Sequence, residues 1–384
     1  MRILYSHRTK SDDGQRIHID GLTDALSALG HEVLIVGPGG ESEPGTAPRP
    51  LTSTHVTQVL PGPLYEAAEI AYAVIGEARL RRVAKRFQPD VLYERYNLYY
   101  PAGGRVARTY GCPFLLEVNA PLVAERRATD ALHFPPLAAR SERRIWQSAD
   151  AVLPVTSVLG RMIADQGVAE DRIHPIGNGV RPEFLEPQDG ADWRARLGLQ
   201  QSVVLGFTGF VREWHRMDRV LSFMSSPDGA GTALLLVGDG PALPSLRQLA
   251  VDLGLEDRVH LIGAKPWTEI PALLAAMDIA LQPAVTPYAS PLKLQEYMAQ
   301  GLSVLAPDQP NIREVADEEV AVLIPPDDET AFHLALASLI RDKDRRHRLG
   351  TAARKRIVDR DLTWTGNAKR VIALAETMLS GDCH

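Results

Sequence analysis

Cysteine and long apolar runs are scarce in this chain of 384 residues. Cys112 and Cys383 are its only cysteines, so it cannot build a disulfide framework or a four-cysteine zinc site. So low a cysteine count is typical of a reducing compartment. No apolar run approaches the eighteen residues of a spanning helix, and residues 1–6 lead directly into a strand rather than a signal peptide. We therefore expect a cytoplasmic protein.

An excess of basic residues and several catalytic motifs are also missing. The chain has 42 Lys and Arg against 48 Asp and Glu, a formal net charge of −6, which argues against nucleic acid as the principal partner. There is no His-Glu-x-x-His pair, no Gly-x-Ser-x-Gly elbow and no Walker loop. Metal hydrolases, serine hydrolases and P-loop enzymes are therefore poorly supported.

Short apolar strands alternate with helical stretches along most of the chain, and its length favours two domains. Strands are expected at 2–6, 32–36, 91–93, 114–118 and 151–155, then at 203–207, 233–237, 259–262, 279–282, 303–306 and 321–324. This alternation predicts two Rossmann-like, doubly wound parallel sheets. We expect an N-terminal domain over 1–185 and a C-terminal domain over 195–360, with a last helix, 364–380, that packs back on the first.

The stretch from Ser290 to Gly301 predicts a short helix with an anion site at its start. Ser290 suits the N-cap, Pro291 the first helical position and Gly301 the C′ position. The N–H groups of Leu292 and Lys293 would lack intrahelical partners, so a phosphate placed there would find donors and a favourable dipole.

Two charged residues of this helix are expected on one face. Lys293 is unfavourable in a first turn unless an anion lies nearby, and Glu296 follows three residues later. A carboxylate accepts hydrogen bonds from two vicinal hydroxyls, so the face suits a phosphate beside a ribose. A surface Lys293–Glu296 pair capped by Ser290 explains these residues equally well.

Three other segments of the second half follow predicted strands. Arg212, His215 and Arg216 come after strand 203–207, where guanidinium groups could neutralise a diphosphate, although a solvated basic turn is the alternative. Gly238 begins a broken glycine fingerprint that fits a tight turn with one backbone contact to a ligand. Gly263 could let the backbone reach a base, or simply form a turn.

In the first half, candidate residues follow two predicted strands. Gly14 lies in the long loop after strand 2–6, where a glycine permits close approach to a ligand, and His18 lies in the first turn of the next helix. An ordinary surface loop is the alternative. Asn119 follows strand 114–118 and could bind a sugar hydroxyl or make an Asx-turn.

A helix near residues 79–86 carries five basic side chains opposite an apolar stripe. Such a face is usually solvated, but it could contact anionic lipid or an acidic acceptor.

Taken together, these motifs resemble the family-four glycosyltransferases of the GT-B fold, retaining enzymes that use nucleotide-sugar donors. The resemblance covers nearly the whole chain and rests on residues 30–33, 149–154, 178–180, 237–241 and, most specifically, 290–306. It implies a donor held mainly by the C-terminal domain, an acceptor held mainly by the N-terminal domain, and an interdomain cleft.

By the same resemblance, Glu296 matches the second glutamate of the family's Glu-x7-Glu motif, which binds ribose, and Lys293 with the Leu292 amide would meet the diphosphate. Three positions depart from the pattern. Tyr288 stands where the first glutamate falls, Phe210 replaces the arginine expected after Gly209, and Asn119 replaces a histidine. The phosphate role therefore passes to Arg212, and to His215 beside it.

These observations predict a retaining, metal-independent glycosyl transfer from a UDP- or GDP-sugar to an acceptor hydroxyl, with no cofactor. Arg212 and Lys293 would stabilise the departing diphosphate, while His18 and Asn119 orient the reacting sugars. The donor-binding residues would be Gly14, Arg212, His215, Gly238, Gly263, Ser290, Leu292, Lys293 and Glu296. The acceptor would be a small molecule, a glycan or a lipid-linked sugar, with peripheral contact at the inner membrane face through the basic helix. A nucleotide-sugar epimerase, or a nucleotide-sugar-binding protein without turnover, is the alternative.

Overall fold

A computed structural model describes residues 1–9, 14–46 and 62–381. Its contacts divide the chain into two compact units. The first comprises Met1–Gly177, Tyr288–Ser290 and the chain from Trp364 onward; the second comprises Asn178–Pro287 and Pro291–Thr363. The division differs from the predicted boundary at residue 185. Phe184 and Leu185 belong to the second unit, where their carbonyl oxygens accept hydrogen bonds from Gln300 and Arg354.

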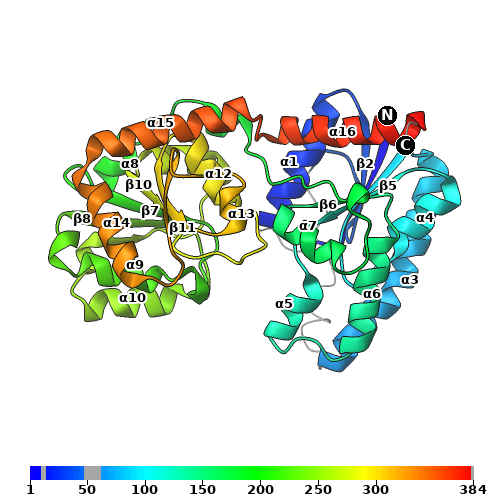
Figure 1. Cartoon of the computed structure of the whole chain (residues 1–384), viewed down its shortest axis with the longest axis horizontal. Helices are drawn as coiled ribbons and strands as arrows, with labels where there is room; N and C mark the ends of the chain where they lie inside the picture. The colour runs from blue at the N-terminus through cyan, green and yellow to red at the C-terminus, as the bar shows by residue number, and fades with distance from the viewer. Residues whose placement is uncertain (10–13, 47–61, 382–384) are drawn as a thin grey trace. The chain divides into compact units, whose positions relative to one another are not determined.

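The first unit is a six-stranded sheet with helices on both sides (Figure 1). The strand order is β3-β2-β1-β4-β5-β6, all parallel except β3. The strands are β1 Arg2–Ser6, β2 Glu32–Gly37, β3 Gly40–Ser42, β4 Val91–Arg95, β5 Phe114–Val118 and β6 Ala151–Pro154. The helices are α1 Gly14–Ala28, α3 Gly62–Phe87, α4 Ala102–Tyr110, α5 Leu122–Ala128, α6 Pro135–Gln147, α7 Ser157–Ala164 and α16 Trp364–Ser380.

The second unit repeats this architecture with all strands parallel, in the order β12-β11-β10-β7-β8-β9. The strands are β7 Val203–Thr208, β8 Thr232–Val237, β9 Val259–Leu261, β10 Ile279–Leu281, β11 Ser303–Pro307 and β12 Ala321–Ile324. The helices are α8 Ala191–Arg196, α9 Met217–Met224, α10 Leu243–Asp252, α11 Ile270–Ala275, α12 Leu292–Ala299, α13 Pro310–Arg313, α14 Glu329–Arg341 and α15 Lys343–Asp359.

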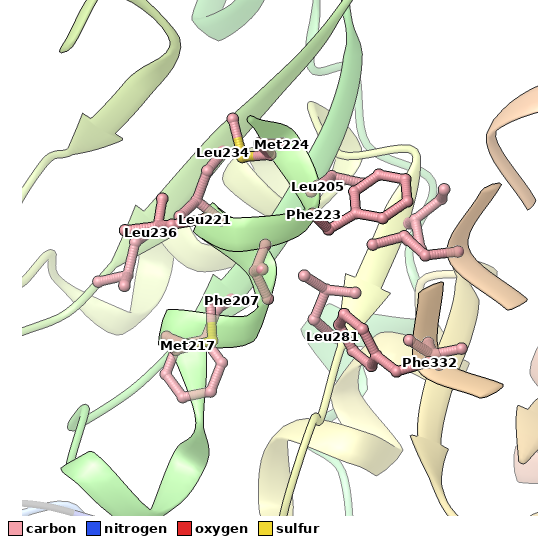
Figure 2. Packing of buried hydrophobic residues seen from close by; sticks show 14 of the residues in the cluster. Leu205, Phe207, Met217, Leu221, Phe223, Met224, Leu234, Leu236, Leu281 and Phe332 are labelled. Atoms are coloured by element: carbon pink, nitrogen blue, oxygen red, sulfur yellow. The ribbon is translucent and has the colours of Figure 1, made fainter. Parts of the chain in front are cut away.

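The strands of both sheets are apolar on both faces, because crossover helices cover a parallel sheet on each side and bury its strands. Every residue of β8 is buried, and Leu205 and Phe207 of β7 pack with it against α9 and α14 (Figure 2). The predicted fold class and all the predicted strands are confirmed. Strand β3 was missed because Gly40–Ser42 has no apolar pattern; it pairs with β2 as a tight antiparallel hairpin.

Each sheet reverses its strand order once, between β1 and β4 in the first unit and between β10 and β7 in the second. Ligands of open parallel sheets bind outside the carboxyl ends of the strands at such a switch point. The segments after β1 and β4, and those after β7 and β10, are therefore where candidate sites are to be sought.

Candidate functional site

The site in the second unit begins with a hydrogen bond between β7 and α12. The Tyr297 hydroxyl accepts a hydrogen bond from the Thr208 N–H at 2.8 Å, and the Tyr297 ring is fully buried. This contact joins the end of β7 to the second turn of α12, the helix that follows β10. The segments on the two sides of the switch point are thereby held next to each other.

Lys293, from the first turn of α12, lies against the segment after β7. Its Nζ stands 3.8 Å from the centre of the Phe207 ring and 3.4 Å from Nε2 of His215. A Cβ added to Gly209 would lie 3.5 Å from the lysine Cε, an ordinary van der Waals distance, so the lysine side chain runs directly beside the Gly209 backbone. Burial lowers the pKa of Lys293 to about 7, although the Glu296 carboxylate opposes the shift.

The tautomer of His215 follows from its other hydrogen bond. Its Nδ1 accepts a hydrogen bond from the Arg212 backbone N–H at 3.0 Å, so in the neutral ring the proton is on Nε2. Burial, together with the charges of Lys293 and Arg212, lowers the pKa of His215 to about 3. Two N–H donors, His215 Nε2 and protonated Lys293 Nζ, are therefore neighbours without an acceptor in either group. An anion that accepts a hydrogen bond from each of them would stabilise this arrangement.

Glu296 lies one turn further along α12 and is partly buried. Burial raises its pKa to about 7, against the opposing charges of Lys293 and Arg181. The free site therefore holds one acid and one base that both change charge near neutral pH. Strongly shifted groups at a strand's carboxyl end are typical of functional sites.

Two of the predicted features at this site are wrong. The N-cap of α12 is Pro291 and not Ser290, because Pro291 has an extended ψ of 116° and so lies outside the helix; it makes no side-chain cap. Arg216 does not join the basic cluster. Its guanidinium group makes ion pairs with Asp218 and Glu329, the latter at 3.0 Å. Gly301 has the left-handed φ of 71° expected at C′.

The glycine segments after β7, β8 and β9 pack backbone against backbone. The Gly209 N–H donates to Val237 O at 2.8 Å, and the Gly238 N–H donates to Gly263 O at 2.9 Å. Gly238 has a φ of 144°, and a Cβ there would lie 2.0 Å from Gly209 O. Only a glycine at position 238 therefore lets the segments after β7 and β8 pack this closely beside the site.

We expect Gly238→Ala to lower the free energy of unfolding by more than about 2 kcal/mol, because the added methyl group forces the Gly209 backbone out of place. Gly263→Ala is the matched control. Its φ of 73° is also left-handed, but a Cβ there meets no atom within 4 Å, so about 1 kcal/mol is expected. Urea unfolding measures both, and equal costs would refute a role for close packing at 238.

A second cluster surrounds the buried carboxylate of Glu117, at the end of β5. It accepts hydrogen bonds from Arg95 Nη1 and Asn119 Nδ2, both at 2.5 Å, and from the Tyr93 hydroxyl at 2.9 Å. His18 Nε2 lies 3.0 Å from Glu117 Oε2, the oxygen that also accepts from Tyr93, whereas Arg95 and Asn119 donate to Oε1. Two residues predicted separately, His18 and Asn119, are thus held by one carboxylate.

The pKa of Glu117 is set by this cluster. Burial alone would raise it, but the charges of His18 and Arg95 and the hydrogen bonds from His18 and Asn119 hold it far below its usual range. His18 is further fixed by Trp364 of α16, whose ring meets the imidazole edge-on at a centroid distance of 4.7 Å. Since α1 begins at Gly14, His18 lies in the second turn and not the first.

Glu94, on the neighbouring strand β4 in register with Leu116, has the opposite character. It is fully buried, and Ser6 Oγ donates a hydrogen bond to it at 3.0 Å. Burial raises its pKa to about 8, although the hydrogen bonds from Ser6 and from the Gly103 N–H act to lower it. The carboxyl edge of the first sheet therefore holds one ionised and one protonated carboxyl group at neutral pH.

Sequence reasoning missed Glu94 and Arg95 and gave Glu117 no role. One signal was present, because two charged residues directly continue the apolar strand that starts at Val91. Of the other predicted residues, Gly14 is the first residue of α1 and Arg212 is exposed, its guanidinium over the Phe210 ring at 5.1 Å. Residues 10–13 of the long loop predicted after strand 2–6 lie outside the described residues.

The basic helix predicted near 79–86 is part of α3, and several of its cations are already paired. Arg81 makes an ion pair with Glu77 at 3.0 Å, Arg86 pairs with Glu41, and Arg79 donates to the backbone carbonyls of the last residue of β2 and of Pro38. None of the helices in the described ranges is long and apolar enough to cross a membrane. Those ranges also contain no group of three His, Cys, Asp or Glu residues placed to hold a metal ion.

Solved structures with the same fold place the chain in a structural class. It superposes on the Anabaena protein HepE in complex with UDP with a TM-score of 0.75 at 17% identity, covering 98% of this chain and 100% of that one. Sucrose-phosphate synthase from Thermosynechococcus elongatus gives a TM-score of 0.76 at 18% identity, with 99% and 100% covered. The architecture is the GT-B fold.

Family models and curated relatives define the family. The model for Glycosyltransferase Family 4 matches residues 13–184, and that for Glycosyl transferases group 1 matches residues 191–356. The chain belongs to the family-four glycosyltransferases, retaining enzymes that use nucleotide-sugar donors and are typically metal-independent.

Among the relatives, 2-deoxystreptamine glucosyltransferase of Streptomyces kanamyceticus is 28% identical over 48% of this chain and 50% of its own length. D-inositol 3-phosphate glycosyltransferase of Stackebrandtia nassauensis is 27% identical over 69% of this chain and 63% of its own length. MMP alpha-(1->4)-mannosyltransferase of Mycolicibacterium hassiacum is 24% identical over 99% of both. The chain therefore matches less than two thirds of the length of the first two relatives.

Proposed function

We propose that this chain transfers a sugar from a UDP- or GDP-sugar to an acceptor hydroxyl with retention of configuration and without a metal ion. The observation that carries the proposal is the pair of N–H donors, Lys293 Nζ and His215 Nε2, 3.4 Å apart at the switch point of the second sheet. A cationic donor and a neutral donor so close together suit the binding of a diphosphate.

Each residue then has a definite task. Lys293, His215 and the exposed Arg212 bind the diphosphate and stabilise the charge that develops as the sugar leaves. Glu296 accepts hydrogen bonds from the ribose hydroxyls, and Gly238 and Gly263 bring backbone close to the nucleotide. The Leu292 amide, Ser290 and Gly14 complete the proposed donor contacts.

The acceptor belongs, in this proposal, to the first unit. His18 and Asn119, both held by Glu117, would orient the reacting hydroxyl, and the leaving phosphate would receive its proton. Because two relatives are named for 2-deoxystreptamine and inositol phosphate, we propose a polyhydroxylated ring compound as acceptor, ahead of a glycan or a lipid-linked sugar. The cytoplasmic location stays a prediction.

A nucleotide screen tests the donor site. The purified chain is melted with UDP, GDP, ADP or dTDP and their common sugars, with EDTA present throughout. One nucleotide is expected to raise Tm. Glu296→Ala should weaken the binding of that nucleotide by about 10- to 100-fold, because the hydrogen bonds between the ribose hydroxyls and the charged carboxylate contribute roughly 1.5 to 3 kcal/mol of binding free energy.

Product analysis separates the alternatives. Acceptor-dependent release of free nucleotide supports the transferase, whereas a changed sugar still attached to the nucleotide indicates an epimerase. Stabilisation without any turnover indicates a binding protein. If no nucleotide raises Tm, the site at Lys293 and Glu296 is structural and the proposal fails.

A further inference from the structure

Trp364 is the first residue of α16, the helix with which the chain returns to the first unit, and it is buried. In Figure 1, α16 lies along α1, the helix that carries His18. Gly21 of α1 makes this packing possible, because a Cβ added there would lie 2.5 Å from Trp364 Nε1. Any larger side chain at position 21 would therefore displace the indole ring.

The first turn of α16 is also held from its other side. Asn367, three residues after Trp364, is buried, and its Nδ2 donates a hydrogen bond to Gly177 O at 2.8 Å. Its Oδ1 accepts one from Arg370 Nη1 at 3.0 Å. A buried amide whose nitrogen and oxygen both make hydrogen bonds is costly to move. The indole ring is therefore a fixed surface and does not follow the side chains packed against it.

The imidazole of His18 has two contacts that restrict it in different ways. The contact between its Nε2 and Glu117 Oε2, at 3.0 Å, fixes the position of one ring atom but leaves the ring plane able to turn about that axis. The indole of Trp364 meets the imidazole edge-on, with an interplanar angle of 62°. Aromatic pairs prefer such a geometry, so this second contact sets how the ring plane is turned.

A small cavity shows what else the indole does. It has a volume of about 10 Å³, and His18, Glu117, Trp364 and Asn367 are among the residues that line it. This volume is close to the least that holds one water molecule. A smaller side chain at position 364 would enlarge the cavity and bring water to the contact between His18 and Glu117, which would loosen the imidazole further.

We propose that Trp364 is a positioning residue for the transfer reaction, which sets the orientation of His18 and, through it, that of the acceptor hydroxyl. The inference rests on the proposed function, in which His18 orients that hydroxyl. A group displaced by about 1 Å lowers the rate of the reaction that it orients by up to about 100-fold. The phosphate and ribose contacts proposed on α12 and after β7 involve neither residue, so the KM of the donor is expected to stay unchanged.

Steady-state kinetics of the full chain test the proposal. Trp364→Leu should lower kcat/KM for the acceptor by about tenfold. Trp364→Phe, which keeps an aromatic ring against His18, should recover it to within about threefold of wild type. Gly21→Ala, which pushes the indole away, should behave like Trp364→Leu. The matched control is Gly76→Ala, whose Cβ would lie 2.6 Å from the Tyr100 ring, an aromatic contact without His18. It should stay within about twofold of wild type.

A double-mutant cycle separates positioning from a general structural role. In the His18→Ala background, Trp364→Leu should cost less than about twofold in kcat/KM, because its effect passes through the imidazole. A second tenfold loss there would overturn the proposal. So would an active wild type whose Trp364→Leu and Gly21→Ala variants are both fully active. If Trp364→Leu does not fold, Gly21→Ala takes its place in the cycle. A wild type without acceptor-dependent nucleotide release is a failure of the proposed function, and this inference falls with it.

Discussion

Lys293→Met is expected to lower kcat/KM by about 10²- to 10³-fold, the usual loss when one donor to a developing anion is removed. Methionine has nearly the length of lysine, so contact with the Phe207 ring and the space beside Gly209 are kept. The loss would therefore report the missing charge and not a collapsed site. Steady-state kinetics with the donor identified by the nucleotide screen measures it.

Lys355→Met is the control, because Lys355 is an exposed lysine of the same unit that makes an ion pair with Asp359, one turn further along α15. Its kcat/KM should stay within about twofold of wild type. Lys293→Arg is not expected to rescue activity, since a longer, planar guanidinium does not place one compact charge 3.4 Å from His215 Nε2 as the ammonium does. A fully active Lys293→Met would remove Lys293 from the mechanism.

The pH dependence of kcat/KM follows from the same pair of residues. Lys293 must be protonated to neutralise the diphosphate, so activity should fall as pH rises through its pKa of about 7. Glu296 must be ionised to accept the ribose hydroxyls, so activity should fall as pH drops through its pKa of about 7. A narrow optimum near pH 7 results.

The variants assign the two limbs of that profile. Lys293→Met should remove the alkaline limb, and Glu296→Gln should remove the acid limb while leaving the alkaline one. A profile that is flat from pH 6 to 8 in wild type would show that neither group titrates in the free enzyme as its burial predicts.

Glu117→Gln is expected to lower the free energy of unfolding by about 3 to 5 kcal/mol, the cost of breaking a buried ion pair from one side. The amide cannot neutralise Arg95, and its NH₂ group would face donors that now point at a carboxylate. Since whole domains are stable by only about 5 to 15 kcal/mol, this is a large fraction. Native-state amide exchange of β4 and β5 measures it within the first unit.

The acid dependence of that difference has a definite sign. The folded-state pKa of Glu117 lies below its ordinary 4.5, so the carboxylate stabilises the fold above that pH and loses its contribution as pH falls below it. The gap between wild type and Glu117→Gln should be constant from pH 6 to 8 and shrink below about 4.5. Glu170→Gln, an exposed substitution in the same unit, should show no gap. A gap below 1 kcal/mol at pH 7 would contradict the role given to Glu117.

The sequence alone predicted the strands and the class of fold, because each strand is a short apolar run between helical stretches. Apolar periodicity is a local property, and it survives in any tertiary context. The same reasoning identified Lys293 and Glu296 as a pair, since residues three apart on a helix share a face. Strand β3, which has no such pattern, was missed.

The meeting of residues far apart in sequence was decided by tertiary structure. Lys293 and His215 are brought together only because β7 and β10 are neighbours at the switch point, and the same packing turns Arg216 toward Glu329 and away from the site. His18 and Asn119 share Glu117 because α1 packs over the ends of β4 and β5. Local pattern determines each element, but the side chains that elements share, and the pKa shifts that follow from burial, depend on sheet order and packing.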